Sequence, residues 1–239
     1  MKTHHRLTVL VLLTALLLAG CGSGGQVGEL RTESQSVELG DAASVGVEIT
    51  LGAGKLELAG GAEKLLEADF TYNVDRLKPE VTYSNGTLAV QQPDSQGLPD
   101  WRGVTGFRNE WVLHLHDETP MDLSVDMGAG SGNLNLAGLA LTALDANFGA
   151  GDYTVDLSGD WARDLQAEID AGAANIRLRL PREVGVCIEV ESGPHTIDTR
   201  GLTKQGNVYT NAAYGVSSVT LRIDLNVGVG QIILEEGDS

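Results

Sequence analysis

The sequence predicts an all-β fold, a stacked β-ladder or single-stranded β-solenoid with Gly-x-Gly corners, preceded by a smaller β-domain. Three observations predict it. Glycine supplies 31 of the 239 residues, about twice its usual share of roughly 7%. Many of these glycines follow segments of alternating apolar residues, and the alternation changes parity at each one. Apart from short, weak candidates, no segment shows helical periodicity.

The composition excludes some classes of protein. Asp and Glu number 33 against 16 Lys and Arg, which gives a net charge of -17. Such a chain lacks the excess of positive charge that would neutralise the many phosphates of a nucleic acid, so we expect no nucleic-acid partner. Apolar residues make up 42% of the chain, which is typical of a folded domain and not of a disordered acidic chain.

Residues 1–20 have the features of a lipoprotein signal peptide. A positively charged start precedes an apolar run at residues 7–20, which is too short to span a bilayer comfortably. The motif Leu18-Ala19-Gly20-Cys21 resembles a bacterial lipobox, in which the cysteine receives acyl chains such as palmitate and becomes the mature N-terminus. We therefore expect lipidation at Cys21 and a flexible tether over residues 21–34.

The lipid anchor has consequences for location and charge. We expect the protein in the cell envelope, on the outer face of the cytoplasmic membrane or on the outer membrane. Removal of residues 1–20 takes away Lys2 and Arg6 and no acid, leaving 14 positive and 33 negative side chains. We expect anionic lipid to repel this mature domain.

Residues 35–119 form the predicted smaller β-domain. It contains one corner, at Gly52 and Gly54, followed by strands at residues 66–74 and 79–92. The second of these segments contains Asn85-Gly86, a strong signal for a type I′ hairpin turn. A loop rich in proline and glycine at residues 93–106 precedes a strand at residues 111–116, and we place the domain boundary near Thr119-Pro120.

Residues 120–239 form the predicted solenoid. A strand keeps one parity, because a shift by one residue turns every side chain to the opposite face. Both halves of each element can face one core only if the chain bends at the glycine. From Gly128 the successive corners are 21, 23, 21 and 35 residues apart, and a period near 20 residues suits one coil. The corner glycines are Gly52, Gly54, Gly128, Gly130, Gly149, Gly151, Gly172, Gly193, Gly228 and Gly230.

Four of these elements carry a family resemblance. They are Leu51-Gly-Ala-Gly, Met127-Gly-Ala-Gly, Phe148-Gly-Ala-Gly and Val227-Gly-Val-Gly, each followed by an alternating strand. They resemble the toast-rack family of bacterial proteins, here as a lipoprotein, and are similar to the C-terminal domain of LiaF-type cell-wall-stress regulators. The resemblance implies a stacked β-ladder with a separate N-terminal part, and no catalytic residues.

Several motifs suggest chemistry but remain incomplete. His114 and His116 share one face of a strand, as a zinc site needs, yet no full ligand set accompanies them. Cys187 has no histidine in a suitable position to make it a nucleophile, and we interpret it as a small strand residue. Asp152 and Asp156 follow a glycine corner but lack the nine-residue repeat of calcium-binding β-rolls. We therefore expect no catalytic residue, cofactor or metal.

The glycine-rich segment at residues 128–132 is followed by a strand and not by the helix that a phosphate loop requires.

Two functions stay open. The solenoid binds an envelope polymer or a protein partner, as an adhesin-like surface module. Alternatively, the protein is an envelope-stress regulator that acts on a membrane sensor.

Overall fold

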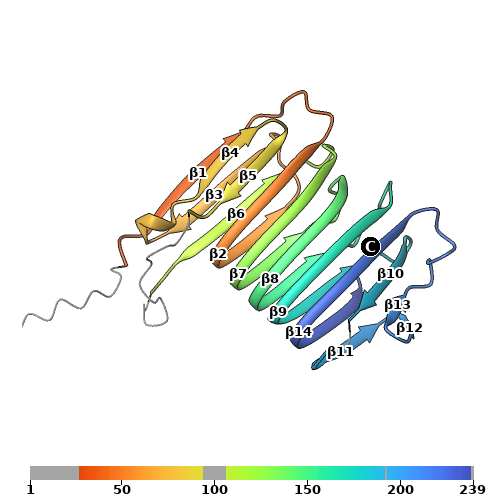
Figure 1. Cartoon of the computed structure of the whole chain (residues 1–239). Coiled ribbons are helices and arrows are strands. Elements are labelled where there is room, and N and C mark those ends of the chain that lie inside the picture. Colours follow the sequence, from red (N-terminus) through yellow and green to blue (C-terminus); the bar gives the residue numbers. More distant parts are fainter. Residues whose placement is uncertain (1–26, 94–105, 192, 238–239) are drawn as a thin grey trace, which may run out of the picture.

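The computed structural model describes residues 27–93, 106–191 and 193–237. Within these residues the regular structure consists of fourteen β-strands in one sheet and a single 3-10 turn, η1 (Asp75–Leu77). The predicted all-β class is confirmed. The sheet is open and is built mainly from parallel strands stacked side by side (Figure 1).

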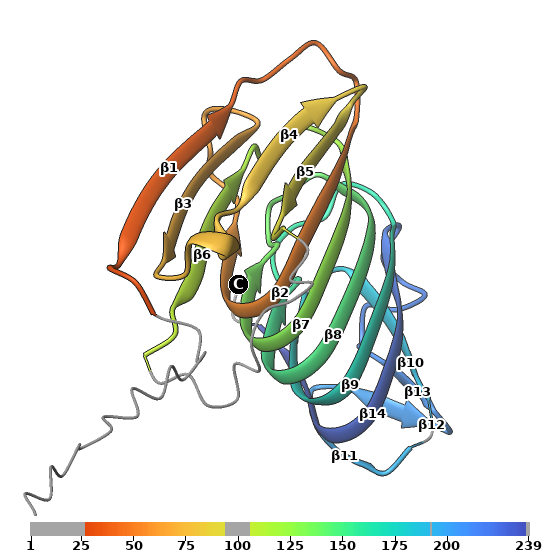
Figure 2. The same ribbon diagram turned by 60° about the vertical axis from the view of Figure 1, so that its left-hand side comes forward.

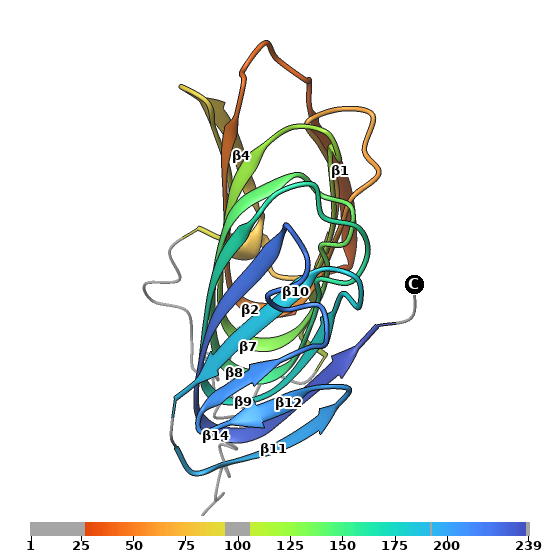
Figure 3. The same cartoon turned by 90° about the vertical axis from the view of Figure 1, so that its right-hand side faces the viewer.

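Long bent strands make the body of the stack. Each runs down one arm, turns at its glycine corner and returns along a second arm, so that it has the shape of a U (Figure 3). A coil is one such strand with a short connecting segment. Each bent strand pairs in parallel with the next, and their order in the stack is β2 (Val45–Ala59), β7 (Met121–Asn135), β8 (Leu141–Asp156), β9 (Leu165–Leu180) and β14 (Thr220–Glu236).

The change of parity at each corner is confirmed. In β8 the buried positions are Leu144, Ala146 and Phe148 before the corner, and Tyr153 and Val155 after it. The bend turns both arms toward each other, so these two sets of side chains meet in one core. The core is continuous through the described part of the chain, from Val45 near one end of the stack to Tyr209 near the other.

At the N-terminal end of the stack, two separate strands take the place of one bent strand. β5 (Thr87–Gln91) pairs with the first arm of β2, and β6 (Asn109–Leu115) pairs with its second arm. Three more strands extend this end (Figure 2). β4 (Glu80–Ser84) lies outside β5, β3 (Leu66–Tyr72) outside β6, and β1 (Arg31–Val37) outside β3.

The predicted hairpin turn is confirmed. Asn85 and Gly86 join β4 to β5, and both residues have positive φ, 52° and 79°, as a type I′ turn requires. The sheet itself continues past the expected boundary near residue 119, because β2 pairs with β7 along both arms. The division of the chain into two domains near residue 119 stays a prediction.

At the C-terminal end, the order of the stack departs from the order of the chain. β14 pairs directly with β9, although β10 (Gly185–Val190) and β11 (His195–Arg200) come before it in the sequence. β10 covers the first arm of β14 and β11 covers its second arm. The short β13 (Val208–Thr210) and β12 (Thr203–Gln205) then extend the β10 side.

Buried polar groups fix the irregular ends of the stack. The Asn211 amide nitrogen donates to the carbonyl oxygens of Pro181 and Val184, at 3.0 and 2.7 Å, and its oxygen accepts from the backbone N–H of Val186 at 2.9 Å. This side chain therefore ties the loop before β10 to the segment after β13. Such bonds are strong constraints because their loss leaves buried polar groups unpaired.

Candidate functional site

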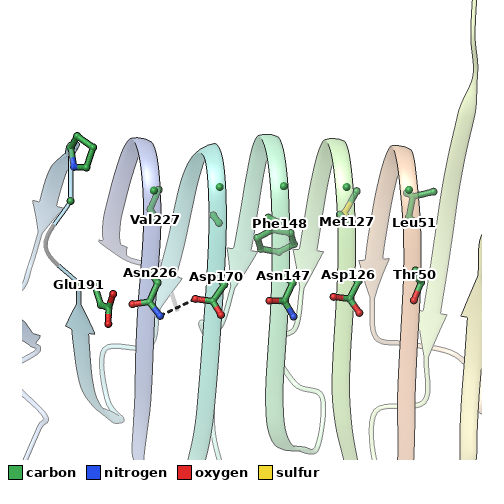
Figure 4. Close-up of a pocket in the computed structure, with 18 residues that line it drawn as sticks. Thr50, Leu51, Asp126, Met127, Asn147, Phe148, Asp170, Glu191, Asn226 and Val227 are labelled. Carbon is green, nitrogen blue, oxygen red and sulfur yellow. Dashed lines mark hydrogen bonds between the residues drawn. The ribbon is translucent and has the colours of Figure 1, made fainter. Parts of the chain in front are cut away.

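An open trough runs across the stack beside the glycine corners. It has a volume of about 660 Å³ and crosses β2, β7, β8, β9 and β14 before ending near Pro194. Its floor is made by the first glycine of each corner, and one wall is made by the side chains two residues earlier (Figure 4). In each bent strand the largely buried apolar residue between them also lines the trough. We call this feature the corner trough.

The floor is bare backbone because adjacent coils approach each other too closely for a side chain. A β-carbon built on Gly149 would lie 2.1 Å from the carbonyl oxygen of Gly128, and one on Gly128 would lie 2.3 Å from that of Gly52. At Gly172 and Gly228 the corresponding distances are 2.7 Å. Distances this short are not found for real β-carbons, so the close approach of the coils requires glycine at these positions.

The second glycine of most corners is required by the same close approach and also by its backbone conformation. Gly54, Gly130, Gly151 and Gly230 have φ between 137° and 150°, a region that residues with a β-carbon rarely adopt. Ala174 takes this position in β9, where its methyl group is buried in the core. Gly193, the remaining predicted corner, lies in the turn between β10 and β11 and lines the end of the trough.

A row of polar side chains forms the wall, one from each layer of the stack, all at the same height (Figure 4). Amides stand between the carboxylates, which lowers the repulsion between like charges on neighbouring strands. The Asn226 amide donates to Asp170 Oδ1 at 2.8 Å, and the Asn147 amide donates to Asp145 Oδ1 at 2.8 Å. In stack order the row is Thr50, Asp126, Asn147, Asp170, Asn226 and Glu191.

The sequence did not lead us to expect a site at this row of polar residues, although a regular spacing in the sequence marks its members. Each member lies two residues before a corner glycine, at a position whose parity points away from the core. Only the in-register pairing of the strands turns that spacing into a continuous line of side chains.

The outer surface next to the trough is acidic. The first arms of the bent strands and β10 carry eight carboxylates and one basic residue, Arg222, among the described residues. This surface attracts amines and repels anions. The carboxylates are Glu48, Asp122, Asp126, Asp145, Glu168, Asp170, Glu189 and Asp224.

The histidine pair does not form a site. β6 ends at Leu115, and the two rings have separate partners. His114 Nδ1 lies 3.1 Å from the Gly60 carbonyl oxygen, and His116 Nδ1 lies 3.0 Å from Thr119 Oγ1. No group of three or more potential metal ligands occurs in the part of the chain that the structure describes.

The remaining predicted site residues are also placed. Cys187 is a half-buried free thiol on β10, paired in register with Arg222 and Thr210. Asp152 accepts a hydrogen bond from Asn175 at 2.8 Å, so it belongs to the polar surface of the sheet. Cys21 lies outside the described residues. Within them, no helix is long and apolar enough to cross a membrane.

Comparisons with known proteins agree with this architecture. A family model described as the N-terminal domain of toast_rack, DUF2154, matches residues 26–179. A crystal structure of a candidate cell adhesion protein from Clostridium sporogenes is 28% identical, with a TM-score of 0.84, and the match covers 87% of this chain and 100% of that one.

A candidate adhesin from Bacteroides fragilis is 12% identical with a TM-score of 0.38, over 85% of this chain and 97% of that chain. No curated protein matches the sequence.

Proposed function

Because this chain belongs to the family of the toast_rack N-terminal domain, DUF2154, we propose that it is a binding protein of the bacterial cell envelope, anchored to a membrane by lipid on Cys21. The family and the adhesion-type relative point to a non-catalytic protein.

The corner trough is the observation that carries the proposal. It offers a similar set of groups, a bare peptide floor and a polar side chain, once per layer of the stack. Adjacent strands are about 4.8 Å apart, so an extended partner lying across the coils meets a new polar group at each step. A repeated surface of this kind suits a polymer or an extended peptide better than a compact small molecule.

The charge of the trough defines the chemistry of that partner. Three of its six polar side chains are carboxylates, Asp126, Asp170 and Glu191, and the surface beside them is acidic. We infer that the partner is an envelope polymer or protein segment that presents amines or other hydrogen-bond donors along its length.

The anchor keeps the domain near its membrane. Six residue steps separate Cys21 from Val27, the first described residue, and at ~3.4 Å each they span at most about 20 Å. Two or more acyl chains would hold the protein stably on the bilayer, on the outer face of the cytoplasmic membrane or on the outer membrane. The domain would then lie among the polymers next to that membrane.

Cross-linked recovery of partners from intact cells tests the proposal. The full chain is compared with the double variant Asp126→Lys and Asp170→Lys, which reverses charge inside the trough. The control is Asp160→Lys, which makes the same change at an exposed loop position outside it. We expect the wild type and the control to recover an envelope polymer or a protein, and the double variant to lose it.

Equal recovery by all three proteins would exclude the trough as the binding surface. Recovery of a transmembrane sensor kinase, lost in the double variant, would favour the alternative function of an envelope-stress regulator acting on that sensor, which follows from the resemblance to LiaF-type regulators.

A further inference from the structure

A second concave surface lies away from the trough, where the ends of four strands meet. Its volume is about 670 Å³. Asp156 is the last residue of β8, Arg179 lies next to the end of β9, Arg200 ends β11, and Glu235 and Glu236 end β14. Asp156, Arg179, Glu235 and Arg200 are paired in register and lie on the outward face of the sheet. Glu236 pairs with the buried Leu180 and lies on the other face. We call this surface the arginine pocket.

Basic residues are concentrated here, where three arginines and three carboxylates line the pocket. Four of the 14 basic residues that follow residue 20 lie in or beside the pocket. The first arms of the bent strands and β10, by comparison, carry one basic residue among eight carboxylates. The four are Arg177, Arg179, Arg182 and Arg200.

The position of β14 in the stack, next to β9 and ahead of β11, brings these arginines and carboxylates together. Because β14 lies between β9 and β11, Glu235 pairs in register with Arg179 on one side and with Arg200 on the other. In a stack that followed chain order, β11 would separate β9 from β14 and this sharing would not occur.

One carboxylate therefore forms ion pairs with three guanidinium groups. Glu235 lies 3.0 Å from Arg177, 3.5 Å from Arg179 and 3.9 Å from Arg200. Only the first distance is that of a good hydrogen bond. Arg179 also lies 3.5 Å from Asp156, and Arg200 lies 3.8 Å from Asp198.

These ion pairs leave donors of the guanidinium groups available. A guanidinium has five N–H donors in a fixed fork, and long, single contacts to carboxylates do not use the paired geometry that an oxyanion can offer. The side chains of Arg179 and Arg200 are also accessible, at 47% and 70% exposure. An oxyanion entering the pocket can reach both without displacing a buried group.

We propose that the arginine pocket binds an oxyanion, a carboxylate or phosphate group of a partner molecule, between Arg179 and Arg200. This is a second site, with ligand chemistry opposite to that of the corner trough, and it does not depend on the function proposed for the trough. The chain as a whole is acidic, so attraction acts only near the pocket, within a screening length of about 8 Å at physiological salt.

Calorimetric titration with two probes tests this proposal. Inorganic phosphate and acetate are titrated separately into the full chain, purified in a non-ionic detergent, at fixed pH and ionic strength. We expect saturable binding to one site, weakened about tenfold or more by Arg179→Gln combined with Arg200→Gln, since charge-assisted hydrogen bonds to both groups are lost. Added salt should weaken binding further.

The control is Arg108→Gln. Arg108 also makes a long ion pair, 3.6 Å from Glu110, and is 54% exposed, but it lies at the other end of the stack. Its variant should bind the probes within about twofold of the wild type. Should the double variant fail to fold, Arg200→Gln alone carries the test, because that side chain is the more exposed of the two.

The two probes distinguish the sources of the ligand. Binding of phosphate alone indicates a phosphate or phosphodiester group, binding of acetate alone indicates a carboxylate, and binding of both indicates a general oxyanion site. The proposal is wrong if neither probe binds saturably, if the arginine variants bind as tightly as the wild type, or if Arg108→Gln weakens binding equally.

Discussion

Replacing Gly149 with alanine should separate two coils of the stack. The new β-carbon would lie 2.1 Å from the carbonyl oxygen of Gly128 and 3.0 Å from its carbonyl carbon. To bring the first contact to 3.0 Å, the oxygen must retreat by about 0.9 Å. A ladder hydrogen bond near 2.9 Å would then exceed the useful range.

The cost follows from the hydrogen bonds that are lost. The corner is exposed, so water can partly replace each lost bond. The net contribution of one hydrogen bond to the free energy of unfolding is then about 0.5–1.5 kcal/mol. With two bonds disturbed, we expect the free energy of unfolding to fall by about 1–3 kcal/mol. For a chain of this length, that lowers the melting temperature by roughly 2–6 °C.

Urea and thermal unfolding followed by circular dichroism measure this difference. Gly46→Ala is the matched control in β2, because a β-carbon there meets only the Thr87 side chain, at 3.6 Å, and the backbone has no positive φ. The control should unfold like the wild type. If Gly149→Ala stays within about 0.5 kcal/mol of the wild type, or Gly46→Ala is equally destabilised, the close-approach explanation is incorrect.

Three further predictions concern other parts of the chain. Asn211→Ala should lower the free energy of unfolding by about 2–4 kcal/mol in urea titrations, because it leaves buried backbone groups unpaired. Hydrogen bonds from Lys78 and Tyr72 hold the pKa of Glu33 below its ordinary value of 4.5. The stabilisation is therefore present above pH 4.5 and lost as pH falls below it, so the difference in melting temperature between wild type and Glu33→Gln should disappear in acid. Mass spectrometry of the N-terminal peptide should show a lipid on Cys21, and Cys21→Ser should remove the protein from the membrane fraction.

Each of these has a result that would contradict it. Asn207→Ala removes a single exposed hydrogen bond, to Glu189, and should change stability by less than about 0.5 kcal/mol. An equal effect of the two asparagine variants would rule out the buried network as the cause. A pH-independent difference for Glu33→Gln, or an unmodified Cys21 in membrane-bound protein, would exclude the other two predictions.

The fold class and the bend at each corner can be predicted from local sequence. Alternation of apolar residues, with parity that changes at Gly149 and Gly228, is a local property of the chain. Because side chains of a strand alternate between its two faces, both apolar sets can reach one core only if the strand bends between them. The hairpin at Asn85 and Gly86 was predictable for the same reason, because positive φ is a property of the residues themselves.

The identity of neighbouring coils, in contrast, becomes visible in the folded stack. All coils have similar apolar arms and similar glycine corners, so local sequence does not distinguish β14 on β9 from β10 on β9. That choice depends on the long-range pairing of whole strands. Both candidate sites depend on it, since the row of Asp170 and Asn226 and the sharing of Glu235 by Arg179 and Arg200 exist only between strands that the stack places side by side.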